Sequence, residues 1–433
     1  MSQTNSENPV SEQVLVLSKE QHQILDRMEK FEGVLFLTGK AGTGKSTLLN
    51  LFKKTSDQKI ITLAPTGVAA VLVGGQTIHS FFRFPPGWIS TKDYKPLSKK
   101  MVEKIKLIII DEISMVRADV LDHMDAVLRM SAKNALPFGG IPMLWIGDLY
   151  QLPPVVSSSE EKEYFQQFYQ SPFFFSAKVM KNIPNFEIIE LNQIFRQNEL
   201  KFIRLLNKIR LNEIDEEDLM ELNQRTIDMG QIVEQPIITL TSTNAAASAI
   251  NLKALSEIDQ VPKIYSASLT GTVQASHHPV DEYLSLKIGA QVMTIKNDPQ
   301  KNYHNGSLGV VTELGEKSIK IRLEGQDEEI EIAPTTWDVV RYKLKDEGIL
   351  AEVVGSFSQL PVKLAWAMTI HKSQGKTFDR IMVDLGRGAF ENGQAYVALS
   401  RCKSLEGVYL KGNLNWRDIR TDERVTDFLR AWT

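Results

Sequence analysis

The sequence has a single cysteine, Cys402, among its 433 residues. A lone cysteine excludes an internal disulfide and fits a reducing compartment, so we expect a cytoplasmic protein. Long apolar runs are also missing, because none approaches the ~20 residues that a membrane span requires. The first thirteen residues, MSQTNSENPVSEQ, lack the charged and apolar regions of a signal peptide. The seven histidines show no metal-ligand spacing with cysteine or glutamate, so we predict no structural zinc.

Positive charge is not in excess either, since the formal net charge is −3. This balance argues against a protein that coats nucleic acid electrostatically. The charge is nevertheless uneven: residues 92–106 hold six lysines against two acids, and residues 213–221 hold six acids and no base. Two solvated faces would explain this pattern, and so would a basic rim beside a binding channel.

A phosphate-binding loop stands near the start of the chain. The apolar run VLFLT (34–38) predicts a buried strand, GKAGTGKS (39–46) follows it, and STLLNLFKK continues in a helical pattern. Such a loop points backbone N–H groups and a helix N-terminus at phosphates, so we predict ATP as the ligand. Lys45 is placed to reach the β- and γ-phosphates, and Ser46 to ligate Mg²⁺. The other predicted ATP contacts are Gly39, Ala41, Gly42, Thr43, Gly44 and Thr47.

Two further apolar runs end in polar residues suited to hydrolysis. The run 107–110 is followed by Asp111 and Glu112, and an acid at the carboxyl end of a core strand lies where ligands bind in open α/β sheets. Asp111 is expected to hold Mg²⁺ through water, and Glu112 to deprotonate the attacking water. After the run MLWIGD, Gln151 is a candidate sensor of the γ-phosphate.

After residue 190, apolar strands alternate with helical patterns, which predicts a second parallel sheet. The expected strands are 236–241, 363–370, 380–385 and 407–410, and the expected helices are 244–255 and 394–401. Gly-Lys-Thr recurs at 375–377, but a complete phosphate loop would need glycine where Ile370 stands. The second half therefore has the predicted fold without a nucleotide site of its own.

Such a domain can still complete its neighbour's site, because hydrolysis needs positive charge on the transition state. Arg196 lies where the second half begins, and Arg401 follows one of its predicted helices. We therefore name both as candidate arginine fingers.

Together these motifs resemble superfamily 1 helicases, most closely the PIF-type (petite integration frequency) DNA helicases and next the RecD-type helicases. The motifs that carry the resemblance follow the family's order along the chain: LSKEQ (17–21), GKAGTGKST (39–47), APTGVAA (64–70), GGQTIHSFF (74–82), DEISMV (111–116), GDLYQLPPV (147–155), IFRQ (194–197), TSTNAAASAIN (241–251), TIHKSQGKTFD (369–379) and GQAYVALSRC (393–402).

The resemblance implies an α/β protein with two RecA-like parallel-sheet motor domains in tandem. The first would span 1–190, and the second would comprise 191–289 and 359–433. An SH3-like barrel would occupy 290–358, where period-two strands and turns fit a small barrel. The chain lacks long extensions, so it is similar to a minimal core enzyme from a prokaryote or virus, nucleoid-associated and monomeric.

The same resemblance implies an ATP-driven motor that moves 5′ to 3′ on single-stranded DNA and opens forked DNA. G-quadruplex unwinding is common in the family, although no residue here shows it. Gln21 would contact the adenine, and Gly375 would couple the DNA grip to ATP. The implied DNA contacts are Pro65, Thr66, Thr77 and His79 in the first domain, and Thr241, Asn244, Thr369, His371, Lys372 and Ser373 in the second.

Residues 81–98, FFRFPPGWISTKDYKPLS, are rich in aromatics and prolines. Aromatic faces stack on bases and a rigid loop can split a duplex, so we predict a wedge here. Its candidate residues are Phe84, Pro85, Pro86 and Trp88, although a packed hairpin explains the composition equally well. Tyr303, His304 and Asn305 are weaker candidates for DNA contact.

Two other functions remain open on the sequence. One is an ATP switch that clamps DNA or protein without unwinding, although Glu112, Arg196 and Arg401 together favour hydrolysis. The other is an RNA helicase, because sugar choice depends on contacts to the 2′-hydroxyl.

Overall fold

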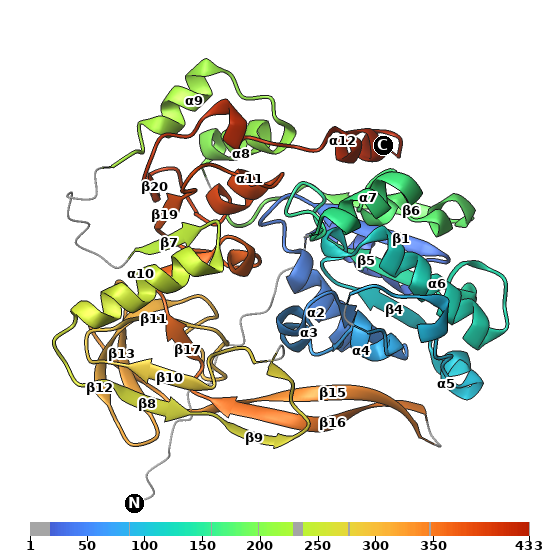
Figure 1. Cartoon of the computed structure of the whole chain (residues 1–433), viewed down its shortest axis with the longest axis horizontal. Coiled ribbons are helices and arrows are strands. Elements are labelled where there is room, and N and C mark those ends of the chain that lie inside the picture. The colour runs from blue at the N-terminus through green and yellow to red at the C-terminus, as the bar shows by residue number, and fades with distance from the viewer. Residues whose placement is uncertain are drawn as a thin grey trace, which may run out of the picture.

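The computed structural model describes residues 18–85, 87–156, 158–197, 199–227, 237–275, 278–345 and 348–432, with the backbone alone at 343–345 and 348–351. Two parallel sheets and a block of antiparallel strands make up these residues (Figure 1). The parallel sheets confirm the α/β prediction.

The first half forms a six-stranded parallel sheet in the order β3-β2-β4-β5-β1-β6. Its strands are β1 (Val34–Gly39), β2 (Ile60–Ala64), β3 (Gln76–Thr77), β4 (Leu107–Ile110), β5 (Met143–Ile146) and β6 (Phe186–Leu191). Its helices are α1 (Lys19–Lys30), α2 (Lys45–Thr55), α3 (Gly67–Leu72), α4 (Ile78–Phe82), α5 (Lys99–Lys104), α6 (Ala118–Ala132) and α7 (Ser159–Phe168). Short 3₁₀ turns lie between them at Thr91–Asp93, Ile113–Met115, Pro137–Gly140, Phe174–Ser176 and Lys178–Asn182.

Apolar side chains cover both faces of this sheet. Along β1, Leu35 and Leu37 join the cluster that α1 and α2 contribute to, while Val34 and Phe36 join the larger cluster on the other side. A strand buried on both faces needs a continuous apolar run, which is why β1 and β4 were visible in the sequence. Their carboxyl ends carry the phosphate loop and the acid pair.

The second half forms a four-stranded parallel sheet in the order β18-β7-β19-β20. Its strands are β7 (Ile238–Thr241), β18 (Ala367–Thr369), β19 (Ile381–Asp384) and β20 (Val408–Leu410). Its helices are α8 (Leu200–Leu211), α9 (Glu216–Asn223), α10 (Asn244–Glu257) and α11 (Gln394–Leu399), with 3₁₀ turns at His371–Ser373 and Trp416–Asp418.

The prediction of one strand over 363–370 was wrong. The structure splits that run into β17 (Val362–Leu364), in the antiparallel block, and β18, in the parallel sheet. The chain changes sheet at two adjacent peptides: the Ala365 amide donates to Gln291 O at 2.9 Å, and the Thr239 amide donates to Trp366 O at 2.8 Å. Both sheets bury this run among apolar side chains, so the sequence alone predicts a single strand.

The antiparallel block reaches beyond the expected limits of 290 and 358. Its five-stranded sheet has the order β14-β13-β12-β11-β17, and β8 pairs with β10 beside it. These strands are β8 (Lys263–Ser266), β10 (Tyr283–Leu286), β11 (Gln291–Thr294), β12 (Leu308–Leu314), β13 (Ile319–Leu323) and β14 (Glu329–Ile332). Leu284 and Leu286 share one apolar core with Val292 and Ile319, so β10 belongs to this block. Its SH3-like character stays a prediction.

A long hairpin extends from this block to the first sheet (Figure 1). It consists of β15 (Thr335–Lys345) and β16 (Gly348–Gln359), and β9 (Ser268–Gly271) pairs with β16. Tyr342 on β15 accepts a hydrogen bond from the Thr62 amide at 3.1 Å, and its ring meets Phe81 edge-on at 6.1 Å. The hairpin thus connects the two halves of the molecule.

The last helix, α12 (Glu423–Arg430), packs on the first half although we expected 359–433 to belong to the second domain. The Phe428 ring stacks on Phe175 at 4.6 Å and approaches Phe186 on β6. None of the helices in the described ranges combines the length and apolar content that a membrane span requires.

Candidate active site

The phosphate loop has the predicted strand, turn and helix around it. β1 ends at Gly39 and α2 begins at Lys45. Gly42 and Gly44 have φ of +83° and +84°, in the left-handed region that favours glycine. The Lys45 ammonium folds into the loop and donates to Gly39 O at 2.6 Å and to Lys40 O at 3.0 Å. In this position the Lys45 side chain lies inside the loop whose backbone amides are predicted to bind phosphates.

The acid pair lies beside this loop in a desolvated pocket. Burial raises the pKa of Asp111 to about 6. Burial and, to a smaller extent, the neighbouring Asp111 together raise the pKa of Glu112 to about 7. Burial also lowers the pKa of Lys45, opposed by Asp148 and Glu112. Two adjacent buried acids would be ionised together if a divalent cation lay between them and the phosphates.

The Ser46 side chain is exposed at the start of α2. Hydroxyl, carboxylate and phosphate oxygens are the ligands that Mg²⁺ prefers. Ser46 and Asp111 therefore fit the predicted metal site, and Thr47 next to Ser46 is exposed as well.

Gln151 stands between the two parallel sheets. Its amide nitrogen donates to Asp148 Oδ2 at 3.1 Å, and its amide oxygen accepts from Gln374 Nε2 of the second half at 3.3 Å. Gln374 directly precedes Gly375, whose φ is +75°. One hydrogen bond and one peptide bond thus connect Gln151, the predicted γ-phosphate sensor, to Gly375, the predicted coupling residue.

Arg401 and Arg196 both reach this cleft. Arg401 is only 1% exposed, and it donates to Val397 O at 2.9 Å, Ser400 Oγ at 2.8 Å and Ser373 O at 3.4 Å. Arg196 donates to Ser400 O at 3.0 Å. Burial and the nearby Arg401 lower the pKa of Arg196 to about 9. Two guanidinium groups close together are suited to bind a phosphate.

Gln21 lies near the phosphate loop, at the first turn of α1. Its side chain completes the capping box with Ser18, at 3.0 Å and 3.2 Å. The amide Nε2 stands 3.9 Å from the point where a Cβ on Gly44 would be. The structure therefore places the Gln21 side chain beside Gly44 of the loop.

The predicted DNA contacts of the first half follow β2 and β3. Thr66 caps α3 by accepting from the Ala69 amide, and Thr77 caps α4 by accepting from the Ser80 amide, both at 3.2 Å. Thr66 is exposed, while Pro65, Thr77 and His79 are half-buried. These four residues therefore lie at one edge of the sheet, as β2 and β3 are parallel neighbours.

In the second half, Thr241, Thr369 and Ser373 are buried. The Thr241 hydroxyl donates to Thr243 O at 3.1 Å, and the Ser373 hydroxyl donates to Ile370 O at 2.6 Å. The Thr369 hydroxyl accepts from the Lys372 amide at 3.3 Å. We had expected direct DNA contacts here, but these hydroxyls shape the strand ends instead.

The other predicted contacts of this half remain accessible. Asn244 and Lys372 are exposed, and His371 is half-buried with its Nε2 3.1 Å from a carboxylate oxygen of Glu391. Because β7 and β18 are parallel neighbours, Asn244 and Lys372 emerge from adjacent strand ends. They are the better candidates for contacting a ligand strand.

The wedge prediction fails at Phe84. Its side chain is only 6% exposed and stacks on Phe82 at 5.4 Å, so no base can reach its face. Trp88 is 46% exposed, with its ring edge-on to Tyr164 at 4.7 Å. Trp88 thus stays a candidate, and Pro86 lies outside the described residues.

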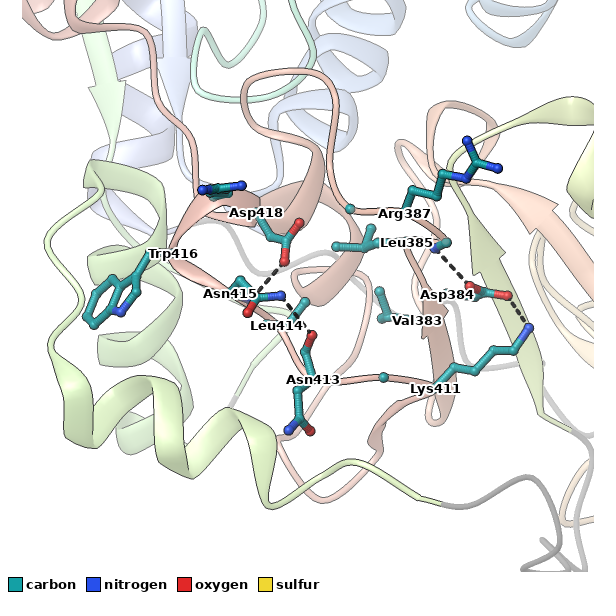
Figure 2. Close-up of a pocket in the computed structure, with 14 residues that line it drawn as sticks. Val383, Asp384, Leu385, Arg387, Lys411, Asn413, Leu414, Asn415, Trp416 and Asp418 are labelled. Atoms are coloured by element: carbon teal, nitrogen blue, oxygen red, sulfur yellow. Dashed lines mark hydrogen bonds and ion pairs between the residues drawn. The ribbon is translucent and has the colours of Figure 1, made fainter.

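A cavity of about 810 Å³ lies away from this cleft, at the carboxyl ends of β19 and β20 (Figure 2). Its acids are engaged within the fold: Asp384 pairs with Lys411 at 2.6 Å, and Asp418 accepts from the Asn415 amide at 2.8 Å. Trp416 points away from the cavity. These two acids therefore have no free carboxylate to offer a ligand in the cavity.

Comparisons with known proteins identify the family of this chain. Residues 16–219 match the model of the PIF1-like helicases. The chain is 34% identical over 438 residues to the ATP-dependent DNA helicase Pif1 of Bdellovibrio bacteriovorus, an alignment that covers 98% of this chain and 93% of that protein. The chain belongs to the PIF1-like helicase family. The predicted family is thereby confirmed.

Two solved structures of Bacteroides Pif1, each 38% identical, resemble this PIF1-like chain to different degrees. The complex with ADP-AlF4 gives a TM-score of 0.88, and the form bound to ssDNA gives 0.68. Each comparison covers 96% of this chain and 97% of the other. This PIF1-like chain is therefore closer in arrangement to the ADP-AlF4 complex than to the ssDNA-bound form.

Sequence reasoning missed several residues of the PIF1-like cleft. The Tyr396 hydroxyl accepts from the Ala41 amide of the phosphate loop at 3.0 Å and lies 3.5 Å from Asp148. Arg210 on α8 lies 3.7 Å from Asp148. Tyr396 and Ser400 are four residues apart and therefore lie on the same helix face. Because Ser400 directly precedes Arg401, this spacing could have identified Tyr396 as a residue of the cleft. Arg210 had no signal, because α8 carries no motif.

Proposed function

We propose that this PIF1-like enzyme moves 5′ to 3′ along single-stranded DNA and unwinds duplex or G-quadruplex DNA as a monomer. The family is that of ATP-dependent DNA helicases, and its named members include ATP-dependent DNA helicase Pif1. Polarity, G-quadruplex unwinding and the monomeric state are the parts that need experiment.

One observation carries the proposal: the hydrolysis site is divided between two sheets. Lys45 and the acid pair stand on the first half, whereas Arg401, Gln374 and Tyr396 approach from the second. Neither half is complete alone, so the site can act only when the halves are together. Each cycle of binding and release can then change the distance between them.

Within this cleft the chain's own groups have distinct roles. Lys45 and the loop amides hold the phosphates, and Glu112 accepts a proton from the attacking water while Gln151 orients it. Mg²⁺, held by Ser46 and Asp111, would neutralise charge on the phosphates. Arg401 and Arg196 stabilise the charge that develops on the transferred group.

DNA contacts on both halves turn this closure into movement. Pro65, Thr66, Thr77 and His79 would hold the strand on the first half, while Asn244, His371 and Lys372 would hold it on the second. If the two grips release alternately, the strand advances with each hydrolysis event. A nucleotide-dependent clamp would use the same contacts but would not separate strands.

The test is ATP hydrolysis with and without single-stranded DNA for wild type and Lys45→Ala. We expect DNA to stimulate the wild type, and the variant to lose at least about 100-fold in turnover, because a charged phosphate contact is removed. DNA binding should persist in the variant. Lys54→Ala, an exposed lysine on the same helix, is the matched control. Wild-type turnover in Lys45→Ala would contradict the site.

A further inference from the structure

Three lysines gather where the antiparallel block meets the second parallel sheet. Lys363 lies on β17, Lys372 in the 3₁₀ turn after β18, and Lys376 three residues beyond that turn. Val362 and Leu364 face the core of the antiparallel block, so Lys363 projects from the opposite face of β17. Val362 pairs with Thr294 on β11, and the Gly306 amide donates to Thr294 O at 2.8 Å, so the loop that carries Asn305 lies beside β17.

This lysine cluster has little compensating charge. The Lys376 ammonium donates to Asn305 Oδ1 at 2.6 Å, and that acceptor is neutral. Lys363 and Lys376 form no ion pair among the described residues, and the acid that opposes the lowering of the Lys363 pKa, Asp281, is exposed. Burial and the neighbouring lysines lower the pKa of Lys363 and of Lys376 to about 8 each.

Like charges that are partly buried together cost free energy unless something of opposite charge compensates them. Such a local conflict in a folded protein often marks a functional site. The compensating group must be an anion, because lysine ammonium groups only donate hydrogen bonds. Phosphate oxygens accept several such bonds at once, so a phosphate suits a cluster of this kind.

The position of the lysine cluster indicates that the phosphate belongs to a DNA strand. Lys372 is one of the exposed groups at the β18 end that we assign to the DNA grip. Lys363 acts on Lys372 electrostatically, and Asn305 brings the loop between β11 and β12 to the same place. We propose that Lys363, Lys376 and Asn305 form a phosphate subsite that continues the DNA track from the second parallel sheet onto the antiparallel block.

This subsite rests on the proposed function, since it requires a bound strand. It adds lysine contacts from the antiparallel block to the DNA grip. The strand would be held on three surfaces instead of two. Because Lys363 and Lys376 stand on different segments, the subsite forms only when β17 and the segment 374–377 are together.

The decisive experiment measures binding of a fluorescent single-stranded oligonucleotide to Lys363→Gln/Lys376→Gln across a range of salt concentrations. Each phosphate contact on a single strand contributes about 0.7 to the slope of log K against log salt, so the double variant should lose about 1.4. Its affinity at low salt should fall accordingly. Basal ATP hydrolysis without DNA should stay at the wild-type rate.

Lys317→Gln is the matched control. Lys317 is exposed in the turn after β12, at the far end of that strand from the loop that carries Asn305. Its loss should leave the slope unchanged. Lys363→Arg/Lys376→Arg keeps both charges and should restore most of the affinity.

Thermal unfolding separates this account from a structural role. Removing two uncompensated lysines should leave the melting temperature unchanged or raise it, whereas loss of a structural contact would lower it. An unchanged salt slope, or a lowered melting temperature with unchanged affinity, would overturn the subsite. So would stabilisation of the wild type by inorganic phosphate alone with normal DNA binding in the variant. A wild type that binds no DNA would instead refute the proposed function.

Discussion

Arg401 is a charged side chain whose three hydrogen bonds all go to uncharged acceptors. Burial lowers the pKa of this guanidinium, and Glu112 and Asp148 only partly oppose the effect. A phosphate in the cleft would supply the missing negative charge. At the scale of single residues, we therefore propose that Arg401 pairs with a phosphate of the bound nucleotide.

We expect Arg401→Ala to lower ATP turnover by about 10³- to 10⁵-fold while nucleotide binding is retained, as for other arginine fingers. Arg401→Lys should also lose most activity, because lysine keeps the charge but not the planar fork. Steady-state hydrolysis and a fluorescent nucleotide titration measure the two effects. Near-normal turnover in both variants would transfer the role to Arg196.

The aromatic residues of the predicted wedge differ in what they hold together. Phe84→Ala should lower the free energy of unfolding by about 3–5 kcal/mol, since it empties a packed ring site. Trp88→Ala should cost much less, and it should reduce strand separation while DNA-stimulated hydrolysis continues. Urea denaturation and an unwinding assay measure these outcomes. Equal stability losses in the two variants would refute this distinction.

At the same scale, the acid pair was predictable and the buried hydroxyls were not. Asp111 follows an apolar run that ends abruptly, so its place at a strand end can be predicted from order alone. The orientation of Thr241 and Ser373 depends on how each loop turns back on its own carbonyls. Residue order does not specify that turn. Phe84 is similar, since composition does not reveal which ring of a cluster packs inward.

At the scale of elements, the hairpin β15–β16 is the clearest connection between the halves. Tyr342 accepts from Thr62 on the first sheet, and the Tyr342 amide lies 3.4 Å from Gln76 Oε1. The lower similarity to the ssDNA-bound form than to the ADP-AlF4 complex indicates that this contact is present in an arrangement that differs from the ssDNA-bound one. Loss of this Tyr342 contact should therefore favour arrangements in which the two halves lie further apart.

We expect Tyr342→Phe to bind single-stranded DNA up to about fivefold more tightly, because one hydrogen bond worth about 1 kcal/mol no longer stabilises the observed arrangement of the two halves. Fluorescence anisotropy measures the affinity. Tyr265→Phe is the control, since the Tyr265 hydroxyl bonds Gly315 O within the antiparallel block at 2.8 Å. Weaker or unchanged binding in Tyr342→Phe would refute a restraining role.

Elements were predicted best where one strand fills one apolar run. β4 matches its predicted range, whereas 363–370 became two strands in different sheets. Nothing in that run signals the change, because both sheets bury apolar side chains equally well. The packing of α12 on the first half was likewise hidden, since an amphipathic helix does not specify its partner.

At the scale of the whole molecule, we propose that one nucleotide site and two DNA surfaces share a single cleft. Opening or closing that cleft changes both together, which is what a motor requires and what a simple binding module does not. The second parallel sheet lacks a phosphate loop, so hydrolysis at the one proposed site would change both DNA-binding surfaces. The central claim is therefore directional movement coupled to hydrolysis.

Unwinding of duplexes with a single-stranded tail at either the 5′ or the 3′ end tests that claim most directly. With ATP and Mg²⁺ present, we expect strand separation from the 5′-tailed duplex alone, and none by Lys45→Ala on either substrate. Separation from the 3′ tail alone would contradict the proposed polarity. DNA-stimulated hydrolysis without unwinding of either duplex would contradict the motor itself and favour the clamp.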